Sequence, residues 1–106
     1  MNGAVLKTAI LERVSGVRIP LPPHMYYVYF LRLRNRRIYT GSTNDLRRRT
    51  KEHEIGNVRA TTSLRPLKLI GYEAYLLKSD AQRRERFLKT TEGKRLFRQQ
   101  YRDVLK

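Results

Sequence analysis

Residues 38–49 read IYTGSTNDLRRR, and this stretch passes from a strand pattern into the start of a helix. The β-branched and aromatic residues at its beginning favour a strand. Thr43 and Asn44 are residue types that cap helix N-termini, and we expect one of them to cap a helix from Asp45 to about Ile55. The motif Tyr39-Thr40-Gly41 therefore ends a strand directly before a run of arginines.

The segment before this stretch predicts the partner strand of a hairpin. Residues 26–33 are aromatic and aliphatic at consecutive positions, which is typical of a strand buried on both faces. Asn35 and Arg36 favour a turn, and residues 37–41 form the returning strand of an antiparallel hairpin. Tyr29 and Tyr39 would then lie on adjacent strands, where their hydroxyl groups can converge on one pocket.

The remaining pattern completes a small α/β domain. A third strand is predicted from Leu67 to Leu76, and a second helix from Asp80 to about Thr90. Gly93 interrupts the helical pattern before a short basic helix that ends at Tyr101. The order strand, strand, helix, strand, helix, helix predicts a three-stranded, mostly antiparallel sheet flanked by helices.

Composition limits the partners of this chain. It has 106 residues, 24 Lys plus Arg against 9 Asp plus Glu, a net charge of +15 and a pI of about 11.0. This length suits one domain, and the charge favours a polyanion such as nucleic acid. A ribosomal-type protein or a solvated basic surface would carry a similar charge, so charge alone does not indicate cleavage.

Absent residue types exclude other classes of site. Cysteine is missing, which excludes disulfides and thiolate zinc sites. No apolar run approaches the roughly 18 residues that span a bilayer, and the start lacks the layout of a secretory signal. We expect a soluble cytoplasmic protein without a membrane partner.

The first 24 residues differ from the rest. They carry +2 of the charge, which leaves +13 on residues 25–106, and they end in Pro20-Leu21-Pro22-Pro23 before His24. The segment Gly16-Val17-Arg18-Ile19-Pro20 is what one reading frame of a transfer RNA T-arm would encode. Our hypothesis is that residues 1–24 are a disordered or spurious extension, that translation starts at Met25, and that residues 25–106 are the domain. A genuine flexible arm is the alternative.

Taken together, these motifs resemble the GIY-YIG endonuclease family, in particular its small stand-alone, single-domain branch. The first signature ends at Tyr29, with Tyr27 and Val28 where the family has glycine and isoleucine. The second survives as Tyr39-Thr40-Gly41, and an arginine, a histidine and a Glu-x-x-x-Lys helix follow in the family's register. The likeness covers residues 25 to about 100.

The resemblance implies the roles of individual residues. Tyr29, Tyr39, Arg49 and His53 match catalytic positions, and Glu85 matches the ligand of one Mg²⁺ or Mn²⁺, with Glu73 as the rival ligand. Ser42 stands where many members carry a lysine. Five further basic residues are candidate nucleic-acid contacts: Arg47, Arg48, Lys51, Arg65 and Lys89.

The function implied is that of a magnesium-dependent DNA endonuclease that hydrolyses phosphodiester bonds. We expect single-strand cuts in branched, damaged or distorted DNA, as in DNA repair, without a small-molecule cofactor. An activating protein partner is left open. The first alternative is a non-catalytic, basic nucleic-acid-binding module of the same fold, and the second is a ribosome-associated or RNA-processing factor.

Overall fold

The computed structural model describes residues 24–106. The expectations for the N-terminal extension, apart from His24, lie outside the described residues. The elements follow the order predicted from the sequence: β1 (Tyr26–Arg32), β2 (Ile38–Thr43), α2 (Leu46–Glu54), β3 (Lys68–Tyr75), α3 (Lys78–Leu88) and α4 (Thr91–Gln100). A 3₁₀ turn spans Thr62–Leu64 between α2 and β3. In this part of the chain, no helix has the length and apolar character needed to cross a membrane.

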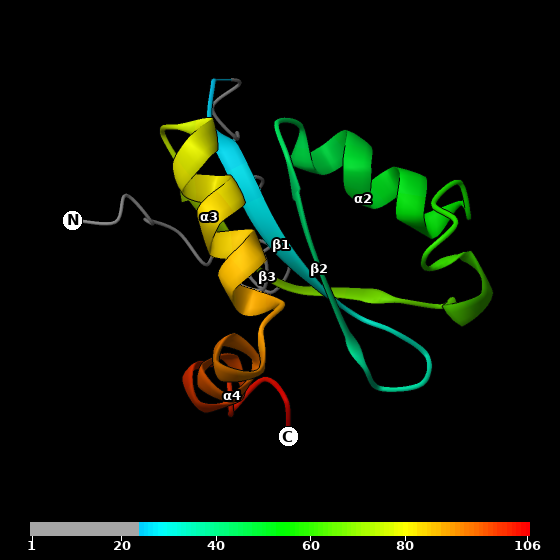
Figure 1. Ribbon diagram of the computed structural model, residues 1–106. Helices are drawn as coiled ribbons and strands as arrows, with labels where there is room; N and C mark the ends of the chain where they lie inside the picture. The colour runs from blue at the N-terminus through cyan, green and yellow to red at the C-terminus, as the bar shows by residue number, and fades with distance from the viewer. Residues whose placement is uncertain (1–23) are drawn as a thin grey trace.

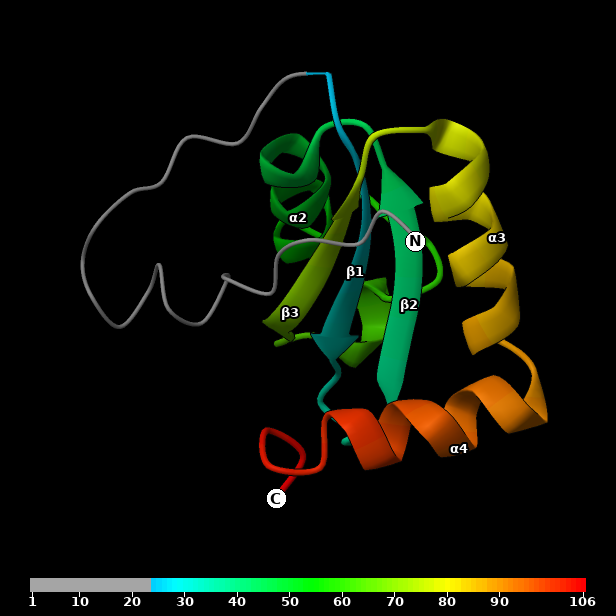
Figure 2. The same cartoon turned by 90° about the vertical axis from the view of Figure 1, so that its left-hand side faces the viewer.

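The three strands form one antiparallel sheet in the order β2-β1-β3, which confirms the predicted fold class. Side chains of the central strand alternate between two cores, because successive residues of a strand point to opposite faces. Tyr29 packs with Leu46 of α2, whereas Phe30 packs with Leu88 of α3 and Phe97 of α4. Helix α2 thus covers one face of the sheet, and α3 and α4 cover the other (Figures 1 and 2).

Gly41 allows the Tyr29 side chain to lie close against β2. It is the register partner of Tyr29 across the β1 and β2 pair. A Cβ atom at position 41 would lie only 2.5 Å from the Tyr29 hydroxyl oxygen, so any other residue would displace that side chain. The glycine of the Tyr-x-Gly motif is therefore required by the position of the tyrosine on the neighbouring strand.

Helix boundaries differ from the sequence predictions at three places. The cap of α2 is Asp45, whose Oδ1 accepts a hydrogen bond from the Arg48 amide at 3.1 Å, and not Thr43 or Asn44. Helix α3 begins at Lys78, before the predicted Asp80. Gly93 does not interrupt a helix but lies in the first turn of α4.

The prediction for Gly93 was wrong because close packing against the end of α3 requires a glycine here, and the sequence pattern does not reveal that packing. Thr90 caps α4 by accepting a hydrogen bond from the Gly93 amide at 3.0 Å. An added Cβ would clash with the Phe87 carbonyl oxygen, so the end of α3 approaches too closely for a side chain.

A buried ionic network fixes α3 and the end of α4 to β3. The Glu73 side chain is 2% exposed, and its two oxygens accept hydrogen bonds from the Tyr75 and Tyr101 hydroxyls at 2.7 Å and from Arg84 Nε at 2.9 Å. Burial alone would raise the pKa of the Glu73 carboxyl, but these donors outweigh it and lower the pKa. Glu73 is therefore held as a structural anion.

Replacing Glu73 by Gln should destabilise the fold by about 3 kcal/mol, because Arg84 would lose its carboxylate in a largely buried site. Urea unfolding measures this change. Asp80→Asn is the matched control, since it breaks an exposed pair with Arg83 and should change the unfolding free energy by less than about 1 kcal/mol. Equal losses in the two variants would contradict the anchoring role of Glu73.

Candidate active site

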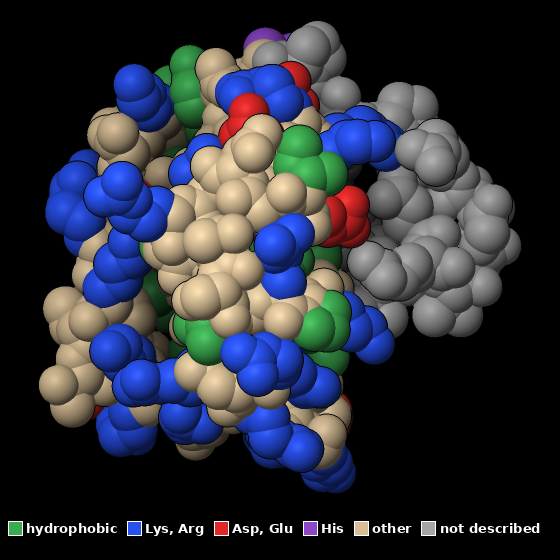
Figure 3. Space-filling model, turned by 90° about the vertical axis from the view of Figure 1, so that its right-hand side faces the viewer, with side chains coloured by type: hydrophobic (Ala, Val, Ile, Leu, Met, Phe, Trp, Pro, Cys, Tyr) green, Lys and Arg blue, Asp and Glu red, His purple; other side chains and the backbone are tan. Residues whose placement is uncertain are grey.

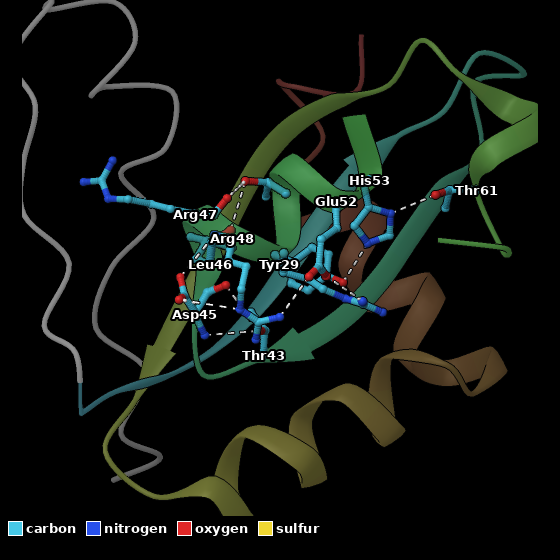
Figure 4. A network of polar contacts seen from close by, with 11 residues as sticks. Tyr29, Thr43, Asp45, Leu46, Arg47, Arg48, Glu52, His53 and Thr61 are labelled. Atoms are coloured by element: carbon cyan, nitrogen blue, oxygen red, sulfur yellow. Dashed lines mark hydrogen bonds and ion pairs between the residues drawn. The ribbon is translucent and has the colours of Figure 1, made fainter. Parts of the chain in front are cut away.

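The site is built around His53, which is completely buried in α2. Its Nε2 lies 2.9 Å from the Tyr29 hydroxyl oxygen, and its Nδ1 lies 2.8 Å from the Thr61 hydroxyl oxygen. Figure 4 shows the imidazole between these two groups, one from the central strand and one from the loop after α2. With both ring nitrogens engaged, the imidazole is fixed in orientation.

Tyr39 lies beside this arrangement on the edge strand. Its ring makes a T-shaped contact with His53 at 5.1 Å between centroids, and it lies 6.3 Å from the Tyr29 ring. The Tyr39 side chain is only half-buried, and its hydroxyl has no hydrogen-bond partner among residues 24–106. The structure therefore brings Tyr29, Tyr39 and His53 together and leaves Tyr39 as the phenol that can reach a ligand.

Arg49 lies one turn before His53 on the same side of α2, as the four-residue spacing requires. Its Nη1 is 3.0 Å from Glu52 Oε1, and its side chain is 34% exposed. Burial raises the pKa of the Tyr29 hydroxyl to about 12, although the neighbouring Arg49 guanidinium opposes the rise. Tyr29 is thus a neutral phenol at physiological pH, next to a cation.

The His53 imidazole is uncharged for two reasons. Burial lowers its pKa, and the positive charge of Arg49 lowers it further. An uncharged imidazole has one donor and one acceptor nitrogen, which matches its two hydroxyl partners. His53 therefore orients Tyr29 without adding charge to the site.

Glu85 approaches the edge strand β2 from α3. Its Oε1 accepts a hydrogen bond from Ser42 Oγ at 2.7 Å, and its Oε2 is 2.8 Å from Lys89 Nζ. Burial would raise the pKa of the Glu85 carboxyl, but Lys89 and Ser42 outweigh it and lower the pKa. The carboxylate is near enough to Tyr29 that its charge raises the pKa of that hydroxyl.

The oxygen ligands at and near Glu85 fit a hard divalent cation that also binds the substrate. A carboxylate and a hydroxyl are oxygen ligands, and Mg²⁺ needs few protein ligands because it keeps waters and binds phosphate oxygens. Within residues 24–106 no group of three or more His, Asp or Glu side chains gathers to hold a metal alone. The rival ligand Glu73 does not fit, because its two oxygens are consumed by the buried network.

The predicted nucleic-acid contacts differ in their surroundings. Arg47, Arg48 and Lys51 are exposed on α2, where Arg48 pairs with Asp45 and Glu52. Arg65 donates hydrogen bonds to the backbone carbonyls of Thr62 and Glu54, and Lys89 pairs with Glu85. Figure 3 shows Lys and Arg side chains along two borders of one face, with few acidic side chains between them.

Three residues that complete the site were not identified from the sequence. Thr61 lies in a polar loop with no periodic signal, and only the fold brings its hydroxyl to His53. Ser42 was noted as a replacement for lysine, whereas in the structure it donates to Glu85. Glu52 could have been found, because an acid three residues after Arg49 is a common helical ion pair.

Comparison with known proteins agrees with the family that the sequence resembles. The family model for the GIY-YIG catalytic domain matches residues 25–101. A UPF0213 protein of Clostridium perfringens is 39% identical over 66 residues, which cover 61% of this chain and 71% of the relative. A UPF0213 protein of Oceanobacillus iheyensis is 36% identical over 61 residues, which cover 57% of this chain and 71% of the relative. A UPF0213 protein of Cupriavidus pinatubonensis is 38% identical over 61 residues, which cover 57% of this chain and 68% of the relative. No solved structure matches with significance.

Replacing His53 by Gln should remove a pH dependence of stability. The pKa of His53 in the folded protein lies below its unfolded value of about 6.5, so the unfolded chain binds a proton in this window that the folded chain does not. The stability that His53 contributes is present above about pH 6.5 and is lost as the pH falls through the folded pKa. The slope cannot exceed about 1.4 kcal/mol per pH unit for one proton.

Urea unfolding of the parent and of His53→Gln between about pH 8 and 5 measures this effect as the difference between the two proteins. That difference should shrink as the pH falls. A difference that stays constant over the range would show that folding does not shift the pKa of His53.

Proposed function

This chain belongs to the GIY-YIG catalytic domain family, and we propose that it is a divalent-metal-dependent DNA endonuclease that nicks branched, damaged or distorted DNA. The observation that carries the proposal is the cluster of Tyr39, Arg49 and the hydrogen-bonded pair of Tyr29 and His53 on one side of the sheet. The family match supports a nuclease-type domain. The charge of residues 25–106 supports a polyanionic substrate.

Arg49 is the candidate that holds the reacting phosphate. Its guanidinium is partly exposed, and α2 holds it beside Tyr29 and Tyr39, which both raise its pKa. A planar fork of donors suits phosphate oxygens, which gain charge as the nucleophile attacks. To bind the phosphate, Arg49 would exchange or share its contact with Glu52.

Tyr39 is the candidate that activates the attacking water. We assign this role to Tyr39 and not to Tyr29, because the Tyr29 hydroxyl is buried, bonded to His53 and has a pKa raised to about 12. In its phenolate form, Tyr39 takes one proton from the water as the water oxygen bonds to phosphorus. The bond to the leaving oxygen breaks, and that oxygen takes a proton from solvent. Tyr29, His53 and Thr61 are then positioning residues, which act on the reaction through Tyr39.

Glu85 is the proposed metal ligand, with Ser42 orienting its carboxylate. When bound, Mg²⁺ or Mn²⁺ would supply Lewis-acid charge to the phosphate oxygens. In the structure both Glu85 oxygens are already engaged, by Ser42 and by Lys89. This observation favours the second candidate function, a binding module of the same fold that does not cleave.

Nicking of supercoiled and branched DNA in magnesium, manganese or chelator separates the two functions. Arg49→Ala and Glu85→Gln should each lower the nicking rate about a hundredfold or more, the loss typical when one preorganised charge is removed. In chelator, Arg49→Ala should bind DNA slightly more weakly, whereas Glu85→Gln should bind equally or more tightly because a repelling charge is lost.

Arg83→Ala and Glu92→Gln are matched controls for these variants. Both residues are exposed and form surface ion pairs on α3 and α4. They should nick at the parental rate. If Arg49→Ala or Glu85→Gln does so too, that residue is not catalytic. A parent without metal-dependent nicking on any of these substrates would favour the binding module.

Lys89→Met should lower the metal concentration needed for half-maximal nicking several-fold. The Lys89 ammonium lies 2.8 Å from Glu85 Oε2 and so competes with a metal for that oxygen. The measurement is made at saturating DNA, which removes any effect of Lys89 on substrate affinity. Lys89→Arg keeps the charge and is the control. An unchanged metal requirement in Lys89→Met would mean that the ion pair does not compete.

A further inference from the structure

A cavity of about 530 Å³ lies next to the candidate active site and against β2. Because β2 is an outer strand of the sheet, one of its edges is unpaired within residues 24–106. The floor of the cavity is apolar, and five side chains from the hairpin, the 3₁₀ turn, α3 and α4 contribute to it: Leu33, Ile38, Leu64, Leu88 and Phe97. A hollow of this size falls within the range of small-molecule sites, about 300–1,000 Å³.

The rim of this cavity is cationic. Arg37, Lys89, Lys94 and Arg98 line it, and no carboxylate of residues 24–106 does. Lys94 and Arg98 are one helical turn apart on α4. Apart from Lys89, which pairs with Glu85, these side chains are exposed and form no ion pair within residues 24–106. Most arginines on α2 and α3 have an acidic partner, whereas the rim cations other than Lys89 have none within residues 24–106. The rim is therefore available to an anion.

The cavity also shares residues with the candidate active site. Tyr39 lines the cavity and contacts His53, and Lys89 lines it and contacts Glu85. Asn35 and Thr40 add hydrogen-bonding groups at the same edge. A ligand in the cavity would therefore lie beside both halves of the candidate site.

We propose that this cavity binds one unstacked nucleotide of the DNA substrate, with the base on the apolar floor beside Tyr39 and a phosphate among the free cations of the rim. The proposal rests on the function proposed above and extends it to the selection of substrate. A base has apolar faces and polar edges, and an aromatic ring next to an apolar surface favours stacking without regard to base identity. A base inside an intact duplex cannot enter, so the cavity selects DNA in which a nucleotide has left the stack.

The unpaired edge of β2 could instead receive a peptide strand. A strand needs backbone hydrogen bonds but not three unpaired cations. The rim therefore favours phosphate, and the peptide remains an outcome of the test.

Photo-crosslinking in chelator tests where the base lies. The probe is a duplex with one extrahelical 5-iodouracil nucleotide, compared with the same duplex in which that nucleotide is paired. We expect a crosslink from the extrahelical base to Tyr39 or Phe97, mapped by mass spectrometry, and little crosslinking from the paired base. Crosslinks that map outside the cavity would overturn the proposal.

Affinity measurements in chelator test whether the base itself is recognised. The parent should bind a duplex with a bulged thymidine about tenfold more tightly than the same duplex with an abasic bulge, which keeps the phosphate but lacks the base. Equal binding of the two would overturn the proposal. It would also indicate that the cavity serves another ligand, such as a peptide strand.

A pair of charge-matched double variants locates the phosphate contact. Lys94→Glu/Arg98→Glu should reduce the preference for the bulged over the fully paired duplex. Lys68→Glu/Arg59→Glu changes the net charge by the same amount at exposed positions that do not line the cavity. It should lower the affinity for both duplexes by the same factor. Equal effects of the two double variants on the preference would overturn the assignment.

These experiments and the nicking assay can fail separately. Binding and crosslinking are measured without metal and without cleavage, so a protein that never nicks DNA can still hold the extrahelical base. A protein that nicks DNA but binds bulged and abasic duplexes equally would retain the proposed activity and lose the proposed nucleotide cavity.

Discussion

The hydrogen bond between Tyr29 and His53 is the constraint on which the rest of the site depends. It joins the central strand to α2, and both side chains are almost completely buried. Because a buried polar group without a partner is costly, the bond fixes the rotation of α2 relative to the sheet. That rotation in turn places Arg49 over the same face. Gly41 makes the bond possible, since a Cβ there would occupy the space of the Tyr29 hydroxyl.

The polar groups on the two faces of the sheet differ in how fully they are paired. On one face, Glu73 is a fully paired carboxylate that binds α3 and the end of α4 to β3. On the other, the Tyr39 hydroxyl has no hydrogen-bond partner in the described part of the chain, and Arg49 is partly exposed. Glu85 lies between these extremes, because it is half-buried and its partners Ser42 and Lys89 are a hydroxyl and an exposed ammonium. Contacts of that kind can be exchanged for a metal, whereas the Glu73 network cannot be opened without loss of packing.

The sequence was sufficient for features with a local or periodic cause. Consecutive apolar residues identified β1 as buried on both faces, and the order of the elements and the fold class followed from pattern alone. The four-residue spacing of Arg49 and His53 placed both on one side of α2. Features with a non-local cause were missed or misjudged. Thr61 reaches His53 only through the path of a loop, and Gly93 is small because α3 ends against it.

The edge strand β2 connects the parts of the molecule that concern the substrate. Tyr39 and Ser42 point toward opposite faces, one to the His53 cluster and one to Glu85. The cavity proposed to bind a nucleotide lies along the edge of β2 that pairs with no other strand of residues 24–106. Arg49 and Glu85 belong to helices on opposite faces of the sheet, so a phosphate that both residues serve would lie at the edge of this strand. For the neighbouring base to enter the cavity, the DNA backbone at this edge would have to depart from the geometry of a regular duplex. Recognition of the proposed kind would depend on how easily DNA deforms and not on base identity.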